Sequence, residues 1–167
     1  ALLNAANGSL SHYPSRPSDM DDALYDLGCS GASSSNIAWG TGSLAYSVHL
    51  WMGDSDSSNI DRLGHRRWIL NPTMGQTGFG AVRAYSAVYA FDRSNQSAAS
   101  VRRVAWPAQN MPLEYFDEED AWSVSFGESV QGSTVMVLLR RQSDGKEWTF
   151  SEDQADGYFA VDNGGYG

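Results

Sequence analysis

The sequence predicts a protein of the α+β class, in which helices pack against a small sheet and a β-rich segment follows. Apolar residues recur at helical spacing between capping residues near 18–28 and 43–53, a pattern typical of amphipathic helices. Segments rich in aromatic and β-branched residues follow at 78–82 and 85–91, as expected for paired strands. No helical pattern is found after Val101.

Two helices are predicted at the start of the chain. Residues 1–6 are strong helix formers, and the Asn-Gly pair that follows them is typical of a helix end. The second helix is predicted from Ser18, which forms a capping box with Asp21, to Gly28. Because no capping residue precedes the first helix, we expect that helix to begin before the first residue of this sequence.

A short strand and a third helix come next. A Gly/Ser-rich loop is expected over residues 28–35, and a strand over residues 36–40. The third helix starts at Ser43 and has apolar residues at Leu44, Val48, Trp51 and Met52. This spacing gives the helix one apolar face, so it must pack on a sheet or on another helix.

The carboxyl-terminal part is predicted to be β-rich. The strands are expected at residues 121–126, 133–139, 146–150 and 158–161, with an Asp-Gly hairpin turn before the third. The polar stretch 92–100 separates this part from the helices, so we divide the chain into a domain of residues 1–98 and an antiparallel extension of residues 99–167. The glycine-rich end closes no element, and we expect the extension to be truncated.

Composition limits the class of function. Hydrophobic residues make up 41% of the 167, enough to form a core. Eleven basic against twenty acidic side chains give a net charge of -9, which repels nucleic-acid phosphates. No apolar run approaches the ~20 residues of a membrane-spanning helix. The single cysteine, Cys29, excludes an internal disulfide and an all-cysteine metal site. We therefore expect neither a nucleic-acid partner nor a membrane span.

Histidine is the side chain best suited to proton transfer and metal binding near neutral pH. The three histidines are His12, His49 and His65. His12 and His65 are predicted in loops or at element ends, which makes them candidates for a functional site. His49 lies within the third predicted helix beside its apolar stripe, where we expect a histidine at the edge of the core.

Arginine and tryptophan side chains each leave two interpretations. Arg66 and Arg67 could hold an anionic ligand, but the favoured interpretation is that one pairs with an acidic helix surface and the other is solvated. Trp39, Trp51 and Trp68 could line a ligand groove, whereas the spacing of Trp51 and Trp68 favours packing in the core.

Several motifs occur in a fixed order along residues 1–92. They are Leu10-Ser11-His12, Ser34-Ser35-Asn36-Ile37-Ala38-Trp39-Gly40, Trp51, and Gly64-His65-Arg66-Arg67-Trp68-Ile69-Leu70-Asn71-Pro72 followed by Gly78-Phe79-Gly80. Their order and spacing resemble those of the CAP superfamily (cysteine-rich secretory proteins, antigen 5 and pathogenesis-related 1) in its bacterial SCP-like form. The Gly-His-Arg segment with its Asn-Pro pair is the most specific of these motifs.

The resemblance implies an α-β-α sandwich with a central cleft, in which two histidines and two glutamates face one another. His12 and His65 match the two histidines. Ser35 stands where the family has its first glutamate, and Asp54 is the nearest candidate for the second. Together with Asn36, these residues are expected to line a ligand-binding cleft.

The resemblance also implies a secreted or cell-surface binding or interaction module, whose ligand is a small hydrophobic molecule such as a lipid, a peptide or a cell-wall component. The alternative is a metal-assisted, peptidase-like hydrolase with His12 and His65 as catalytic and metal-ligating residues, Asp54 assisting, and zinc or another divalent cation bound. The loss of a carboxylate at Ser35 favours the non-enzymatic module, because two imidazoles and one carboxylate make a weak zinc site. A third interpretation assigns binding to the β-rich extension.

Overall fold

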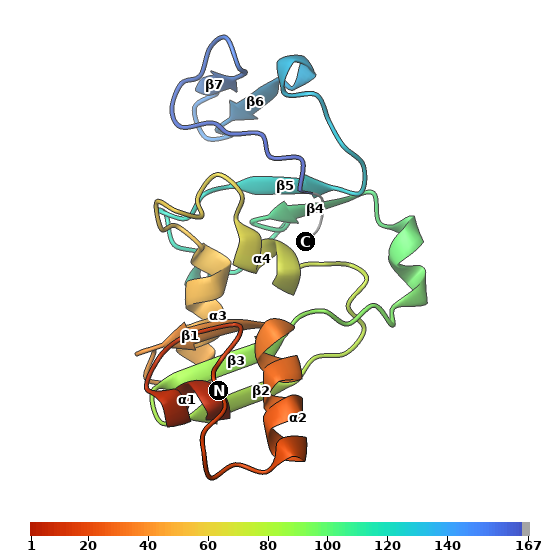
Figure 1. Cartoon of the computed structure of the whole chain (residues 1–167). Helices are drawn as coiled ribbons and strands as arrows, with labels where there is room; N and C mark the ends of the chain where they lie inside the picture. The colour runs from red at the N-terminus through yellow and green to blue at the C-terminus, as the bar shows by residue number, and fades with distance from the viewer. Residues whose placement is uncertain (165–167) are drawn as a thin grey trace.

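The computed structural model describes residues 1–164 and is of mixed α+β composition, with small antiparallel sheets, as the sequence predicts (Figure 1). Its helices and strands are α1 (Leu2–Asn7), α2 (Asp22–Ser33), β1 (Ser35–Trp39), α3 (Leu44–Gly53), α4 (Gly64–Ile69), β2 (Phe79–Val82), β3 (Tyr85–Tyr89), β4 (Arg103–Trp106), β5 (Ser123–Phe126), β6 (Val137–Arg140) and β7 (Glu147–Phe150). Short 3-10 turns lie at Gln96–Ser100, Leu113–Tyr115 and Gly132–Thr134.

The largest sheet has the strand order β1-β3-β2, with β3 antiparallel to both neighbours. Four consecutive residues are buried in β1 and again in β3. Successive side chains of a strand point to opposite faces, so both faces of this part of the sheet are covered. Helices α1 and α2 contact the sheet and each other, and α3 contacts the sheet and α4.

Helix α3 is fixed at both ends and along its length. Ser43 caps its start, because the Ser43 hydroxyl accepts a hydrogen bond from the Tyr46 N–H at 3.1 Å. The Ser47 and Ser86 hydroxyls lie 2.7 Å apart, which joins the helix to β3. Near its end, the Trp51 indole donates to the Ile37 carbonyl of β1 at 3.3 Å. The carboxyl end of α3 is therefore held against β1.

The second helix differs from the prediction at both ends. Its cap is Asp21, whose carboxylate accepts from the Leu24 N–H at 2.9 Å, and it continues to Ser33. The glycine expected to end it, Gly28, lies in its middle. A Cβ atom at Gly28 would lie 2.7 Å from Leu3 Cδ1. Gly28 therefore allows α1 and α2 to pack closely, and the expected loop is helical over most of its length.

Further elements were predicted only in part. Strands β2 and β3 confirm the pair expected at 78–82 and 85–91, and β5, β6 and β7 fall within or near expected strands. Helix α4 and strand β4 were not predicted. Residues 158–161 form no strand; instead an isolated bridge joins Phe150 to Ala155.

The carboxyl-terminal strands form two separate two-stranded sheets, β4-β5 and β6-β7. In Figure 1 they lie at the opposite end of the molecule from α1 and α2, and α4 lies between the two parts. Residues 165–167 of the expected extension lie outside the described residues. Among the helices of the described part, none is long and apolar enough to cross a membrane.

Candidate functional site

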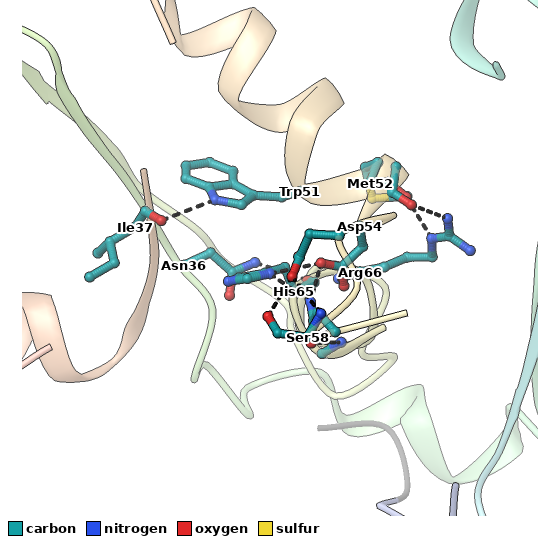
Figure 2. A network of polar contacts seen from close by, with 12 residues as sticks. Asn36, Ile37, Trp51, Met52, Asp54, Ser58, His65 and Arg66 are labelled. Carbon is teal, nitrogen blue, oxygen red and sulfur yellow. Dashed lines mark hydrogen bonds and ion pairs between the residues drawn. The ribbon is translucent and has the colours of Figure 1, made fainter. Parts of the chain in front are cut away.

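The segment between α3 and α4 brings Asp54 and His65 together (Figure 2). Asp54 ends α3 in the left-handed conformation, with φ of 50°, and its N–H donates to the Leu50 carbonyl. His65 lies in the first turn of α4. Its Nδ1 is 2.8 Å from Asp54 Oδ1. Left-handed backbone is uncommon for a residue other than glycine and is found at functional sites.

Asp54 is buried within a set of hydrogen-bond donors. Its side chain is 1% exposed. The Asn59 side-chain amide donates to Oδ1, and the Arg66 N–H donates to Oδ2 at 3.2 Å. Asn59 Nδ2 also lies 3.0 Å from His65 Nδ1, so this nitrogen faces one acceptor and one donor, and it donates to Asp54 in the tautomer that carries the proton on Nδ1. In the neutral ring this leaves Nε2 as an acceptor.

Asn36 holds the backbone of the same histidine. It is a buried residue of β1, and its side-chain amide donates to the His65 carbonyl at 2.9 Å (Figure 2). The imidazole of His65 is therefore positioned through Asp54, and its backbone is positioned through Asn36.

A cleft of about 440 Å³ lies beside this pair. Its apolar lining residues, which we call the apolar wall, are Leu10, Ile37, Ala38, Trp39, Leu50 and Trp51; its polar lining residues, which we call the polar wall, are Asp54, Ser55, Asp56 and His65. The indole of Trp39 is the most open part of the apolar wall, since the residue is 64% exposed. A concave site with an apolar wall and a few convergent polar groups is typical of ligand-binding sites.

Asp56 contributes a negative charge to the polar wall. Hydrogen bonds from Ser58, above all from its hydroxyl, lower the pKa of Asp56 from its usual value, and nearby His65 lowers it further. Asp56 therefore stays ionised at neutral pH. The Asp54 side chain is buried, whereas Asp56 is exposed to solvent. Asp56 is therefore the carboxylate of the cleft that a ligand can reach.

The cleft contains some of the expected site residues and not others. His65 and Asp54 line it. His12 is exposed and is not among the lining residues; its Nδ1 lies 2.8 Å from the Ala32 carbonyl. Ser35 and Asn36 are buried in β1 and are also outside the lining. Neither the hydrogen bonds of the described residues nor the cleft lining joins His12 to His65.

A protein zinc site takes three or four His, Cys, Asp or Glu ligands. Within residues 1–164, no group of three or more such side chains is arranged to hold a metal ion. The two Asp54 oxygens already accept from His65, Asn59 and Arg66.

The favoured interpretation of the two arginines was wrong, because neither is solvated and the acidic partner of Arg67, Asp162, does not lie on a helix. Arg66 is the more buried of the two. It is 1% exposed, and its guanidinium donates to backbone carbonyls of Met52 at 2.5 Å, Gly53 at 2.8 Å and Ala121 at 2.6 Å. Burial lowers the pKa of Arg66 to about 10, against the opposing effect of nearby acidic residues, so Arg66 stays charged at pH 7. Arg67 pairs with Asp162 at 2.8 Å.

The three tryptophans take two different roles. Trp51 is 2% exposed and belongs to the core cluster with Ala38 and Val88, and Trp68 stacks on Phe91 with ring centroids 4.1 Å apart. Both therefore pack against other residues, as predicted. Trp39 instead forms part of the cleft wall.

Sequence reasoning did not identify Leu10, Leu50 or Asp56 as cleft residues. Leu50 lies next to the apolar stripe of α3 and is 48% exposed. An apolar residue that lies off the buried face of a helix is the available signal, but single exposed leucines are common on protein surfaces.

Comparisons with protein-family models, with curated proteins and with solved structures find no match.

Proposed function

We propose that this chain is a secreted or cell-surface binding module of the CAP/SCP type, and that the cleft between Trp39 and His65 holds its ligand. The motifs along residues 1–92 support the family assignment. The ligand that we propose has an apolar part that lies on Trp39 and a polar part that reaches His65. Lipids, peptides and cell-wall components can all meet this description.

The arrangement of the amino-terminal elements supports the α-β-α sandwich that belongs to this proposal. Helices α1 and α2 contact the sheet as a pair, α3 contacts it separately, and β1 and β3 are buried along four consecutive residues. Buried residues at consecutive positions of a strand are expected where both faces of a sheet are covered.

The observation that carries the proposal is the exposed indole of Trp39 on the wall of a cleft whose other wall contains a positioned histidine. An exposed indole within a concave site offers apolar area that a ligand can bury. The polar wall then fixes the orientation of what binds.

Binding of the neutral apolar fluorophore N-phenyl-1-naphthylamine tests this proposal. We expect saturable binding to the full chain and a loss of about tenfold in affinity in Trp39→Ala, equivalent to about 1.4 kcal/mol. Trp122→Ala is the matched control, because Trp122 is exposed to 60% and does not line the cleft. Equal losses in both variants would contradict binding at the cleft.

A second candidate function is a hydrolase in which His65 acts as a general base. The observation in its favour is the 2.8 Å contact between His65 Nδ1 and Asp54, because a carboxylate that orients a histidine also stabilises its protonated form. This candidate predicts hydrolysis of fluorogenic peptides by the full chain, with a loss of at least about 100-fold in His65→Ala. If no peptide is hydrolysed, the hydrolase is contradicted and the non-enzymatic binding module is the candidate that remains.

Calorimetric titration with zinc separates the metal-assisted form of this hydrolase from the form without metal. A shared site predicts one-site binding that both His12→Ala and His65→Ala abolish. The contacts of His12 and Asp54 with other groups favour the opposite result, in which the two variants behave as the parent chain does.

Export is the remaining part of the proposal and rests on the resemblance alone. We expect the protein in the medium or on the surface of intact cells of its source. Immunodetection of the protein before and after protease treatment of intact cells tests this.

A further inference from the structure

The cleft proposed as the binding site has more acidic than basic lining residues. Its titratable lining residues are Asp54, Asp56 and His65, and lysine and arginine do not occur in the lining that the described residues form. The nearest buried cation, Arg66, directs its guanidinium to the carbonyls of Met52, Gly53 and Ala121. With neutral His65, the cleft is therefore anionic.

The exposed carboxylate of this wall has one oxygen available to a ligand. Asp56 Oδ1 accepts from the Ser58 N–H at 3.0 Å and also from the Ser58 hydroxyl. In the part of the chain that the structure describes, Oδ2 accepts no hydrogen bond. An ionised oxygen without a protein partner attracts a cationic group.

The apolar wall adds a second preference for cations. The face of an indole ring carries negative charge density and attracts ammonium and guanidinium groups. Trp39 offers an exposed indole in the same cleft as Asp56. A ligand with a basic group and an adjacent apolar group can therefore use both walls.

The end of β1 at Trp39 favours an extended ligand. β1 is an outer strand of its sheet, because the strand order is β1-β3-β2. Ile37 and Ala38 are buried and the Ile37 carbonyl accepts from the Trp51 indole, so the open part of this edge in the cleft lining is at Trp39. Extended peptides are commonly recognised at the open edge of an outer strand, with specificity set by pockets for their side chains.

We propose that the cleft between Trp39 and Asp56 recognises an extended peptide segment that carries a lysine or arginine next to an apolar side chain. This inference rests on the proposed binding function and names the chemical class of its ligand. It excludes acidic peptides as ligands, because the carboxylates of the cleft repel them.

Three blocked tripeptides test the inference: N-acetyl-Leu-Lys-Leu amide and its Gln and Glu counterparts. Isothermal titration of the full chain at low salt is expected to give the Lys peptide about tenfold higher affinity than the Glu peptide, with the Gln peptide between them. Asp56→Asn should reduce this preference about threefold. Asp61→Asn is the matched control, because Asp61 is exposed in the same loop and does not line the cleft.

The outcomes separate this inference from the binding function. Equal affinities for the three peptides, with all three weakened by Trp39→Ala, would overturn the charge preference and support the cleft as a binding site. Failure of every peptide to bind would overturn the peptide assignment, while binding of the neutral fluorophore would still decide the binding function. A Lys preference that Asp56→Asn and 0.5 M salt both reduce would support the inference.

Discussion

Asp54 is the residue that organises the polar wall of the cleft. Its two oxygens accept hydrogen bonds from His65, Asn59 and the backbone of Arg66, and its own backbone closes α3 in the left-handed region. The conformation and the side chain therefore set the position of His65 together.

Replacement of Asp54 by Asn is expected to keep the fold but to weaken the preference of the His65 proton for Nδ1. Asn tolerates left-handed backbone, and the new amide can no longer act as a carboxylate that fixes the Nδ1 proton. We expect a destabilisation of about 1–3 kcal/mol and loss of the Nδ1–H preference in imidazole ¹⁵N spectra. Asp61→Asn serves as control. An unchanged Nδ1–H signal in Asp54→Asn would show that Asp54 does not fix the ring.

Arg66 is the second residue with a large expected effect. Substitution by Met keeps the apolar volume but removes the donors to Met52, Gly53 and Ala121, which leaves buried carbonyls unpaired. Denaturant unfolding should show a loss of about 3 kcal/mol. The same change at exposed Arg93 should cost less than about 0.5 kcal/mol. Equal effects at both positions would contradict this role for Arg66.

At the scale of elements, the loop that precedes β2 is tied to the end of β3 by Asp92. Its Oδ2 accepts from the Ser94 hydroxyl at 2.6 Å and from the N–H groups of Gly75 at 2.8 Å and Gln76 at 2.9 Å. These bonds, led by the one from the Ser94 hydroxyl, lower the pKa of Asp92 to about 2.

This depressed pKa predicts the direction of an acid effect. The ionised form is favoured in the folded chain, so the contribution of Asp92 to stability is present above the usual carboxyl pKa of about 4 and is lost as pH falls toward 2. Asp92→Asn should lower the melting temperature at pH 7 and reduce its dependence on pH between 5 and 2. Parallel melting curves across this range for the variant and the parent would contradict the assignment.

Elements were predictable where local signals agreed. Ser43 and the stripe from Leu44 to Met52 predicted α3, and aromatic and β-branched residues predicted β2 and β3. Helix α4 gave no such signal, because it begins after Leu63, which has a φ of 46° and provides no side-chain cap. The end of α2 was misplaced because Gly28 serves packing against α1, which no local pattern reveals.

The sequence motifs named residues of the candidate site, but they did not indicate which of these residues lie together in space. Asp54 and His65 were both named from their place in the motifs, and they lie in contact. The partners of Arg66 could not be predicted from local sequence patterns, because Ala121 and Ser123 follow Arg66 by 55 and 57 positions in the chain. His12 matches its motif but lies outside the cleft lining, where local sequence cannot place it.

At the scale of the whole molecule, the carboxyl-terminal extension is bound to the helical part through α4. Arg66 donates to the Ala121 carbonyl and to the Ser123 hydroxyl next to and in β5, and its guanidinium lies 5.6 Å from the centroid of the Trp106 ring in β4. Because the backbone of Arg66 also holds Asp54, the extension and the cleft share one anchoring residue.

Removal of residues 99–167 should therefore destabilise the remaining chain. Arg66 would lose its Ala121 and Ser123 acceptors, and we expect the melting temperature to fall by about 5–10 °C relative to the full chain. The fall should be smaller when Arg66→Met is already present, because the two changes remove the same contacts. An unchanged melting temperature would show that the extension is independent of the helical part.

The indole N–H signals of the six tryptophans report on binding between Trp39 and His65. In a ¹⁵N-labelled chain titrated with N-phenyl-1-naphthylamine, we expect the Trp39 indole signal to shift and saturate while that of Trp122 stays in place. Saturating shifts at Trp122 or Trp148 with an unperturbed Trp39 signal would place binding on the extension and show that the cleft does not bind this ligand.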